Sequence, residues 1–142
     1  MIDPELVTRK MVLIAADLKA LGRFADRPLE QYLADATDEV LVERYLERII
    51  GRMIDINYHL VTEAGEPPPR DYFASFTHLA RLGVLSPAFA TRIAACAGLR
   101  NRLVHEYDEI DPERVYAGMQ SAVRDVPEYL RLIESYLDRS VS

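Results

Sequence analysis

The segment RNRLVHEY, residues 100 to 107, gathers residue types that handle phosphate and protons. Arg100 and Arg102 carry planar guanidinium groups, which suit bidentate contacts to phosphate oxygens. His105 titrates near neutral pH and can give or take a proton, Asn101 can orient a ligand through hydrogen bonds, and Tyr107 supplies a hydroxyl. These types point to phosphate chemistry, although each of them also has an ordinary structural use in a helix.

The charge distribution places this segment at the end of a locally basic region. The chain carries a net charge of −6, which argues against a general nucleic-acid coat. From Tyr72 to His105, however, there is no Asp or Glu, and the four arginines of that stretch are Arg81, Arg92, Arg100 and Arg102. Two interpretations stay open here: a local anion site, or arginines that only solvate two helices.

The elements that must position the motif are all predicted to be helices. Asp-Pro or Ser-Pro pairs predict helix starts at Pro4, Pro87 and Pro112. A short amphipathic turn, LEQYLAD, leads to Thr37, the expected cap of a long helix that stops near Gly65. After the stiff GEPPPR connection, a further helix is expected from Asp71 to Gly83, and the helix that starts at Pro87 should run on into the motif.

Bulk properties agree with a single helical domain over residues 1–142. No strand alternation or internal repeat is visible, so we expect an all-α bundle of four or five helices. No stretch approaches the ~20 apolar residues of a membrane span, and the N-terminus lacks a signal-peptide pattern. The single Cys96 cannot form an internal disulfide. We therefore expect a cytoplasmic protein with no membrane partner.

Helix geometry creates a problem for Arg100. An unbroken helical period aligns it with an apolar stripe formed by Phe89, Ile93, Cys96, Leu103 and Tyr107. A guanidinium in such a stripe needs a carboxylate partner, a hydrated cleft or an interface. His105 lies five residues later, about 140° around the helix. Either the last turn curls, or two copies of the motif meet across a two-fold axis.

Structural interpretations of the same residues remain open. Arg100 can pair with Asp55 of the long helix as a buried ion pair. His105 can cap the C-terminus of its helix, and Tyr107 can simply pack. Asp55 and His59 offer two metal ligands on one helix face, but the sequence fixes no third ligand beside them. We therefore expect no metal site.

The segment matches the R-x-x-x-x-H-x-Y signature, and the chain around it matches in order as well. The run IDINYHLVTEAGEPPPRDYFASFTHLARLGVLS precedes the motif, and YDEIDPERVY follows it. On these residues the chain resembles HEPN domains of the HepT kind, the toxin half of a toxin–antitoxin pair whose antitoxin is a minimal, MntA-like nucleotidyltransferase.

The resemblance implies an up-and-down helical bundle that forms a homodimer, with two copies of the motif at the interface. It also implies a metal-independent ribonuclease without a cofactor. In that activity His105 would serve as general base or acid, and Arg100 would hold the scissile phosphate. Asn101 would orient the histidine or the phosphate. Asp55 and Arg102 are candidate supporting residues.

For Tyr107 the resemblance implies a regulatory role. In this family the antitoxin attaches AMP to the tyrosine of the signature, and a bulky anionic nucleotide beside Arg100 would block RNA. The alternative is a dimeric binding module that docks a nucleotidyltransferase, or binds a nucleotide, without cleaving RNA. An enzyme predicts cleavage that is lost in His105→Ala, whereas a binding module predicts no cleavage from the wild-type chain.

Overall fold

The computed structural model describes residues 1–106 and 108–140, and this part of the chain is helical without strands. The prediction of an all-α bundle is confirmed. The seven helices of the described residues are α1 (Pro4–Ala25), α2 (Leu29–Leu33), α3 (Ala36–Glu63), α4 (Tyr72–Arg81), α5 (Pro87–Ile93), α6 (Ala95–His105) and α7 (Pro112–Ser140).

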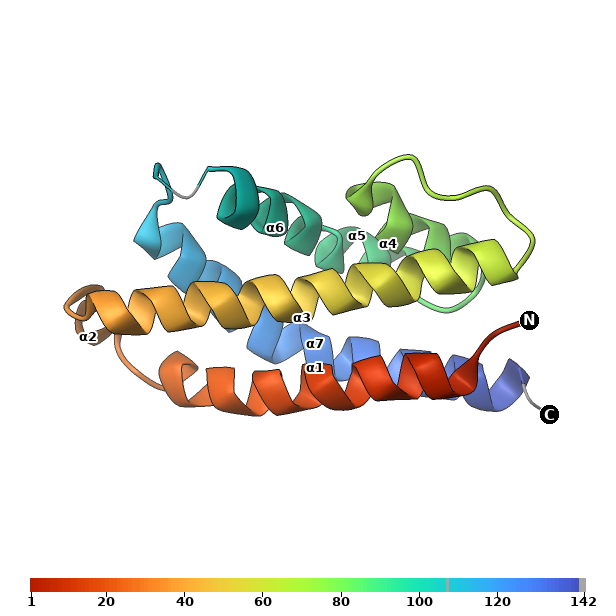
Figure 1. The fold of residues 1–142 in the computed structure, drawn as a ribbon, viewed down its shortest axis with the longest axis horizontal. Coiled ribbons are helices and arrows are strands. Elements are labelled where there is room, and N and C mark those ends of the chain that lie inside the picture. The colour runs from red at the N-terminus through yellow and green to blue at the C-terminus, as the bar shows by residue number, and fades with distance from the viewer. Residues whose placement is uncertain (107, 141–142) are drawn as a thin grey trace.

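The bundle is built around α3, which packs against α1 on one side and against α4 and α6 on the other (Figure 1). Chain direction alternates from α1 to α3, then to α6 and to α7, so the start of α1 and the end of α7 lie at the same end of the bundle. The predicted up-and-down arrangement is therefore present, with α4 and α5 forming the layer that leads into α6.

Most of the predicted helix boundaries are confirmed by their capping interactions. The Asp3 carboxylate accepts a hydrogen bond from the backbone N–H of Leu6, and Pro4 occupies the first helical position. Ser86 caps α5 in the same way. Gly65 and Gly83 follow α3 and α4 with φ of 83° and 76°, a left-handed conformation that glycine adopts without strain.

Two boundaries differ from the sequence prediction. The N-cap of α3 is Asp35 and not Thr37, because the Asp35 carboxylate accepts hydrogen bonds from the backbone N–H groups of Thr37 and Asp38. The expected continuous helix into the motif is divided at Ala94. There the Ala97 N–H donates to the Ala94 carbonyl (3.0 Å), a 3₁₀-type bond that tightens the turn and separates α5 from α6.

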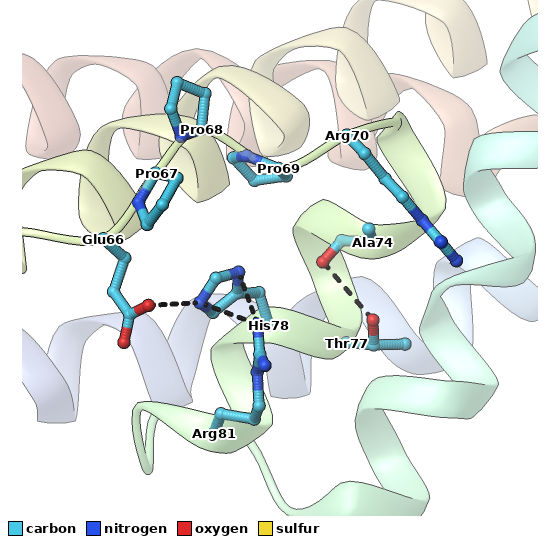
Figure 2. A pocket seen from close by; sticks show the side chains of 9 residues that line it. All are labelled: Glu66, Pro67, Pro68, Pro69, Arg70, Ala74, Thr77, His78 and Arg81. Carbon is cyan, nitrogen blue, oxygen red and sulfur yellow. Dashed lines mark hydrogen bonds and ion pairs between the residues drawn. The ribbon is translucent and has the colours of Figure 1, made fainter.

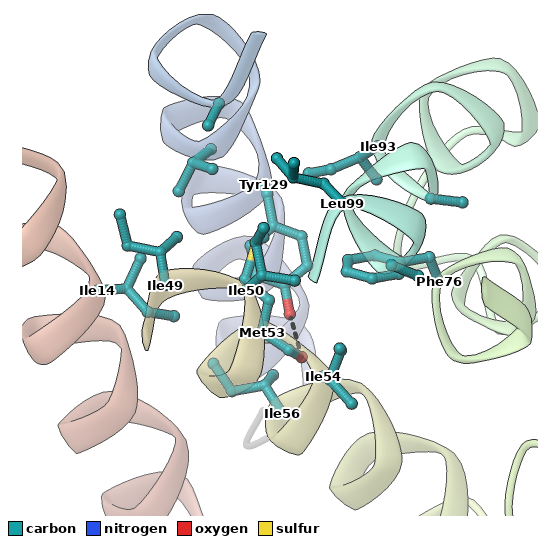
Figure 3. Packing of buried hydrophobic residues seen from close by; sticks show 14 of the residues in the cluster. Ile14, Ile49, Ile50, Met53, Ile54, Ile56, Phe76, Ile93, Leu99 and Tyr129 are labelled. Carbon is teal, nitrogen blue, oxygen red and sulfur yellow. Dashed lines mark hydrogen bonds between the residues drawn. The ribbon is translucent and has the colours of Figure 1, made fainter. Parts of the chain in front are cut away.

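This division and the short α2 raise the number of helices in the described chain above the expected four or five. The core itself follows the apolar periodicity. Side chains from six helices meet in Figure 3, with Ile14 from α1, Met53 from α3, Phe76 from α4, Ile93 from α5, Leu99 from α6 and Tyr129 from α7. The helix that carries the motif is thus fixed to the core through Leu99 and Leu103.

Candidate active site

Arg100 lies in a cleft between α6, α3 and α4 that has a volume of about 490 Å³. The guanidinium carbon lies 5.0 Å from the ring centroid of Tyr72, a cation–π arrangement. The sequence required a carboxylate, a hydrated cleft or an interface for this arginine. Within the described residues it occupies a cleft with an aromatic side chain on one side.

Tyr72 is held in place by a chain of buried hydrogen bonds that crosses three helices. The Ser75 hydroxyl donates to the Tyr72 carbonyl (2.7 Å) and accepts from the Asn57 side-chain amide (3.2 Å). The Tyr129 hydroxyl donates to the Asn57 amide oxygen (2.6 Å) and also lies 3.1 Å from the Met53 carbonyl. Because Asn57, Ser75 and Tyr129 are fully buried, this chain ties the start of α4, and with it the Tyr72 ring, to α3 and α7.

Asp55 lines the same cavity but does not pair with Arg100. Its carboxylate accepts from the Lys10 ammonium at 3.0 Å, and the Asp55 side chain is 58% exposed. The alternative of a buried Arg100–Asp55 ion pair is therefore wrong for the described residues. Asp55 instead connects the edge of the Arg100 cleft to α1.

Two further arginines lie in the cleft, and the sequence did not single them out. Arg48 and Arg52, one turn apart on α3, line the cavity beside Arg100. Both form ion pairs with the carboxylate of Asp17 on α1, Arg48 at 3.0 Å and Arg52, which donates a hydrogen bond to it, at 2.7 Å. The Asp17 side chain is only 8% exposed, so the pairing fixes both guanidinium groups at the wall of the cleft. The i, i+4 spacing of Arg48 and Arg52 was the available signal.

His105 lies in the last turn of α6, outside the Arg100 cleft. It is exposed, as is Asn101 one turn earlier on the same side of the helix. The helix is regular from Ala95 to His105, and the Glu106 N–H closes it on the Arg102 carbonyl at 2.9 Å. The last turn therefore does not curl His105 back toward Arg100. Of the two ways to unite Arg100 and His105, the curled last turn is therefore absent from the described residues.

Arg102, like His105, lies outside the cleft that holds Arg100. Arg102 is exposed and lines a cavity on the α7 side of α6. The proposed modification site, Tyr107, lies outside the described residues. Within a single chain the structure thus places Arg100 with Asp55, and Asn101 near His105, on two different sides of α6.

A larger cavity, of 650 Å³, lies away from the motif (Figure 2). Its roof is the segment Pro67 to Pro69, and its floor is the outer side of α4. His78 is buried there, 3.4 Å from a Glu66 carboxylate oxygen and 3.1 Å from the Arg81 guanidinium. Of the residues named in the sequence analysis, Arg81 of the acid-free stretch lines this cavity, but Arg100, Asn101, Arg102 and His105 of the motif do not.

The residues considered for a metal have other partners. His59 Nε2 accepts a hydrogen bond from the Asp3 backbone N–H at 3.0 Å, and Asp55 pairs with Lys10. No group of three or more His, Cys, Asp or Glu side chains suited to a metal ion occurs among residues 1–106 and 108–140. Over the same residues, no helix has both the length and the apolar character that a membrane span requires.

Comparisons with known proteins agree with this arrangement of helices. The family model of ribonuclease HepT-like proteins matches residues 14–133. The chain is 37% identical over 136 residues to the tRNA nuclease HepT of Aphanizomenon flos-aquae, covering 96% of this chain and 92% of that protein. It is 27% identical over 105 residues to the mRNA nuclease HepT of Shewanella oneidensis, covering 74% of this chain and 79% of the relative.

A solved structure has the same fold. The tri-AMPylated HEPN toxin of Shewanella oneidensis, determined in complex with its MNT antitoxin, superposes with a TM-score of 0.82 at 24% identity, covering 95% of this chain and 99% of that one. The match of the family model over most of the chain, together with the relative of 37% identity, shows that this protein is a member of the ribonuclease HepT-like family.

Proposed function

We propose that this protein is the ribonuclease toxin of a toxin–antitoxin pair and cleaves RNA at a site shared by two copies of the chain. The observation that carries the proposal is the placement of Arg100 and His105 on different sides of a regular α6, in a chain that belongs to a ribonuclease family. The relatives described above are a tRNA nuclease and an mRNA nuclease, which supports RNA as the substrate.

The proposed chemistry needs only groups that the chain supplies. The ribose 2′-hydroxyl attacks the adjacent phosphorus, the P–O5′ bond breaks, and the products are a 2′,3′-cyclic phosphate and a free 5′-hydroxyl. His105 takes the proton of the 2′-hydroxyl or delivers one to the leaving 5′-oxygen. Arg100 binds the phosphate and stabilises the charge that develops on its oxygens, and Asn101 orients the histidine or the phosphate.

Complementation between two inactive variants tests the shared site. Arg100→Ala and His105→Ala should each abolish cleavage in the presence of EDTA. Mixed in equal amounts and allowed to exchange subunits, they should recover about a quarter of wild-type activity, because half of the dimers are mixed and each mixed dimer has one intact site. Each variant incubated alone under the same conditions is the control.

The possible results separate three conclusions. Recovery supports the shared site. Active wild-type protein without recovery in the mixture would place both residues in one chain and refute the two-copy arrangement. If the wild-type chain cleaves no RNA but still dimerises and binds a nucleotidyltransferase, the chain is a binding module and the nuclease proposal fails.

The regulation of the site is proposed from the solved relative. That toxin is tri-AMPylated and in complex with its antitoxin, which supports a nucleotidyltransferase partner for this chain. In the proposed step the Tyr107 hydroxyl oxygen attacks the α-phosphorus of ATP, pyrophosphate leaves, and the phenolic proton passes to solvent. With the partner enzyme and ATP, intact mass should rise by whole AMP units and cleavage should fall. Tyr107→Phe should stay unmodified and active, and modification of that variant would assign the acceptor elsewhere.

A further inference from the structure

On the opposite side of α6 from Arg100, a groove runs between α5, α6 and α7. It has a volume of 450 Å³, and four of the residues that line it are Arg92, Arg102, Arg114 and Arg124. We call it the arginine groove. Its floor is made of small or apolar residues, among them Ala95, Leu99, Ala117 and Gly118. Small and apolar residues between long basic side chains leave room for an extended anionic chain.

One end of the arginine groove is organised by a buried carboxylate. The Asp125 side chain is 5% exposed and accepts from Arg124 through both of its oxygens, at 3.0 Å each. Arg92 approaches the same carboxylate at 3.2 Å from α5. The Arg124 hydrogen bonds lower the pKa of Asp125 below its usual range, so the carboxyl stays ionised and holds both guanidinium groups. One carboxylate fixes two arginines whose outer surfaces stay exposed.

The other two arginines have no partner of this kind. Within the described part of the chain, the guanidinium groups of Arg102 and Arg114 form no hydrogen bond or ion pair, and both side chains are exposed. The Arg102 side chain leans back along α6, so that its Nη1 lies 3.5 Å from the position that a Cβ atom would take at Gly98. The lining of the arginine groove therefore has four arginines and one carboxylate, Asp125. Arg102 and Arg114 also line an adjoining cavity of 220 Å³ together with Glu106, Glu109 and Asp111, so the excess of positive charge is confined to the groove.

The arginine groove also lies next to the catalytic histidine of the proposed function. Arg102 and His105 are three residues apart and share the exposed side of α6, whereas Arg100 points into the cleft on the other side. A polyanion bound along α6 and α7 would therefore lie on the same side of α6 as His105. Guanidinium forks match phosphate oxygens in geometry, and the lining of the arginine groove contains no lysine.

We propose that the arginine groove is a second phosphate-binding subsite, which holds the RNA backbone on one side of the cleaved bond through Arg102 and Arg114. This inference rests on the proposed function, because it requires that RNA is the substrate. It does not depend on which residue transfers the proton. It assigns substrate affinity to a surface separate from the Arg100 cleft.

The test measures binding of a single-stranded 2′-O-methyl oligoribonucleotide, which cannot be cleaved because its 2′-oxygens are blocked. Fluorescence anisotropy should show about tenfold weaker binding by Arg102→Gln/Arg114→Gln than by wild type. The slope of the logarithm of the association constant against the logarithm of the salt concentration is negative, and its magnitude should decrease by about 1.4 in this variant. Each lost phosphate contact removes about 0.7 from that magnitude for a single strand. On cleavable RNA the same variant should raise KM and leave kcat within about twofold.

The matched control is Arg9→Gln/Arg23→Gln. It removes two positive charges from exposed positions of α1, outside the arginine groove. This control should bind within about twofold of wild type, with an unchanged salt slope. If both double variants bind RNA equally more weakly than wild type, the loss of affinity comes from the lower net charge alone, and the proposal is overturned. Unchanged RNA binding by the variant of the arginine groove would overturn it as well.

Two further outcomes separate this inference from the proposed function. If the variant of the arginine groove binds RNA normally but loses the nucleotidyltransferase complex, the surface is a protein-docking site and the RNA subsite is refuted. If the wild-type chain binds the uncleavable RNA and the variant does not, while no RNA is cleaved by either, the subsite stands and the nuclease assignment fails.

Discussion

Replacing the aromatic ring beneath Arg100 tests whether that ring positions the guanidinium for catalysis. The Arg100 guanidinium carbon lies 5.0 Å from the Tyr72 ring centroid, in a partly buried cleft. A cation–π contact in such a place contributes about 1 kcal/mol, between the values for exposed and for fully desolvated pairs. If the bound transition state depends on that contact, Tyr72→Leu should lower kcat/KM for RNA about fivefold.

The comparison of two variants separates positioning from general damage to the fold. Tyr72→Phe keeps the ring face under Arg100 and the edge-on contact with Tyr58 (6.3 Å between centroids, 82° between planes), so it should retain activity within about twofold. Tyr72→Leu loses both contacts and should also unfold at a lower urea concentration. Initial cleavage rates are therefore measured where urea unfolding shows every variant to be folded. Wild-type kcat/KM in Tyr72→Leu, or an equal loss in Tyr72→Phe, would refute the role of the ring.

Three more expectations follow from the packing. Tyr129→Phe removes a buried hydroxyl that serves two acceptors on α3, so the free energy of unfolding in urea should fall by about 1–3 kcal/mol, and a loss below about 0.5 kcal/mol would contradict the network. Burial, together with a nearby carboxylate, raises the pKa of the Cys96 thiol to about 12, so thiolate forms only as pH rises far above 8. Alkylation by iodoacetamide at pH 8 should be slow in the folded protein and rapid after unfolding. A Cβ at Gly118 would lie 2.6 Å from a methyl group at the end of the Leu99 side chain, so that side chain must shift and Gly118→Ala should lower the free energy of unfolding relative to Gly22→Ala. No atom lies within 4 Å of the Cβ position at Gly22, and alanine has the higher helix propensity, so Gly22→Ala should raise the free energy of unfolding in urea by up to ~1 kcal/mol.

Helix starts were predictable where a local pair of residues determines them. Ser86 before Pro87, for example, satisfies a backbone N–H of its own helix and needs nothing from the rest of the chain. Ala94 carries no such signal, because alanine favours an unbroken helix. The division between α5 and α6 therefore has no local marker in the sequence, and the single helical period that aligned Ile93 with Arg100 did not account for it.

The candidate site was predictable in its residue types but not in its surroundings. The acid-free stretch and the helical period together identified Arg100 as an arginine that needs a special environment. What the environment consists of depends on contacts between residues far apart in the sequence. The Asn57–Tyr129 hydrogen bond joins residues 72 positions apart, and the Asp17–Arg52 pair joins residues 35 positions apart. Periodicity within one helix carries no information about such partners.

The spacing within the motif explains why Arg100 and His105 face different sides of α6. Residues two apart in a helix differ by about 200°, so Arg100 and Arg102 necessarily face opposite sides of α6, toward different cavities. His105, about 140° from Arg100 and about 60° from Arg102, lies on the exposed side between them. A phosphate that reaches His105 along the arginine groove therefore cannot meet the Arg100 of the same chain without passing around the helix. In the proposed two-copy site this obstacle is absent, because the Arg100 of one chain would lie beside the His105 of the other.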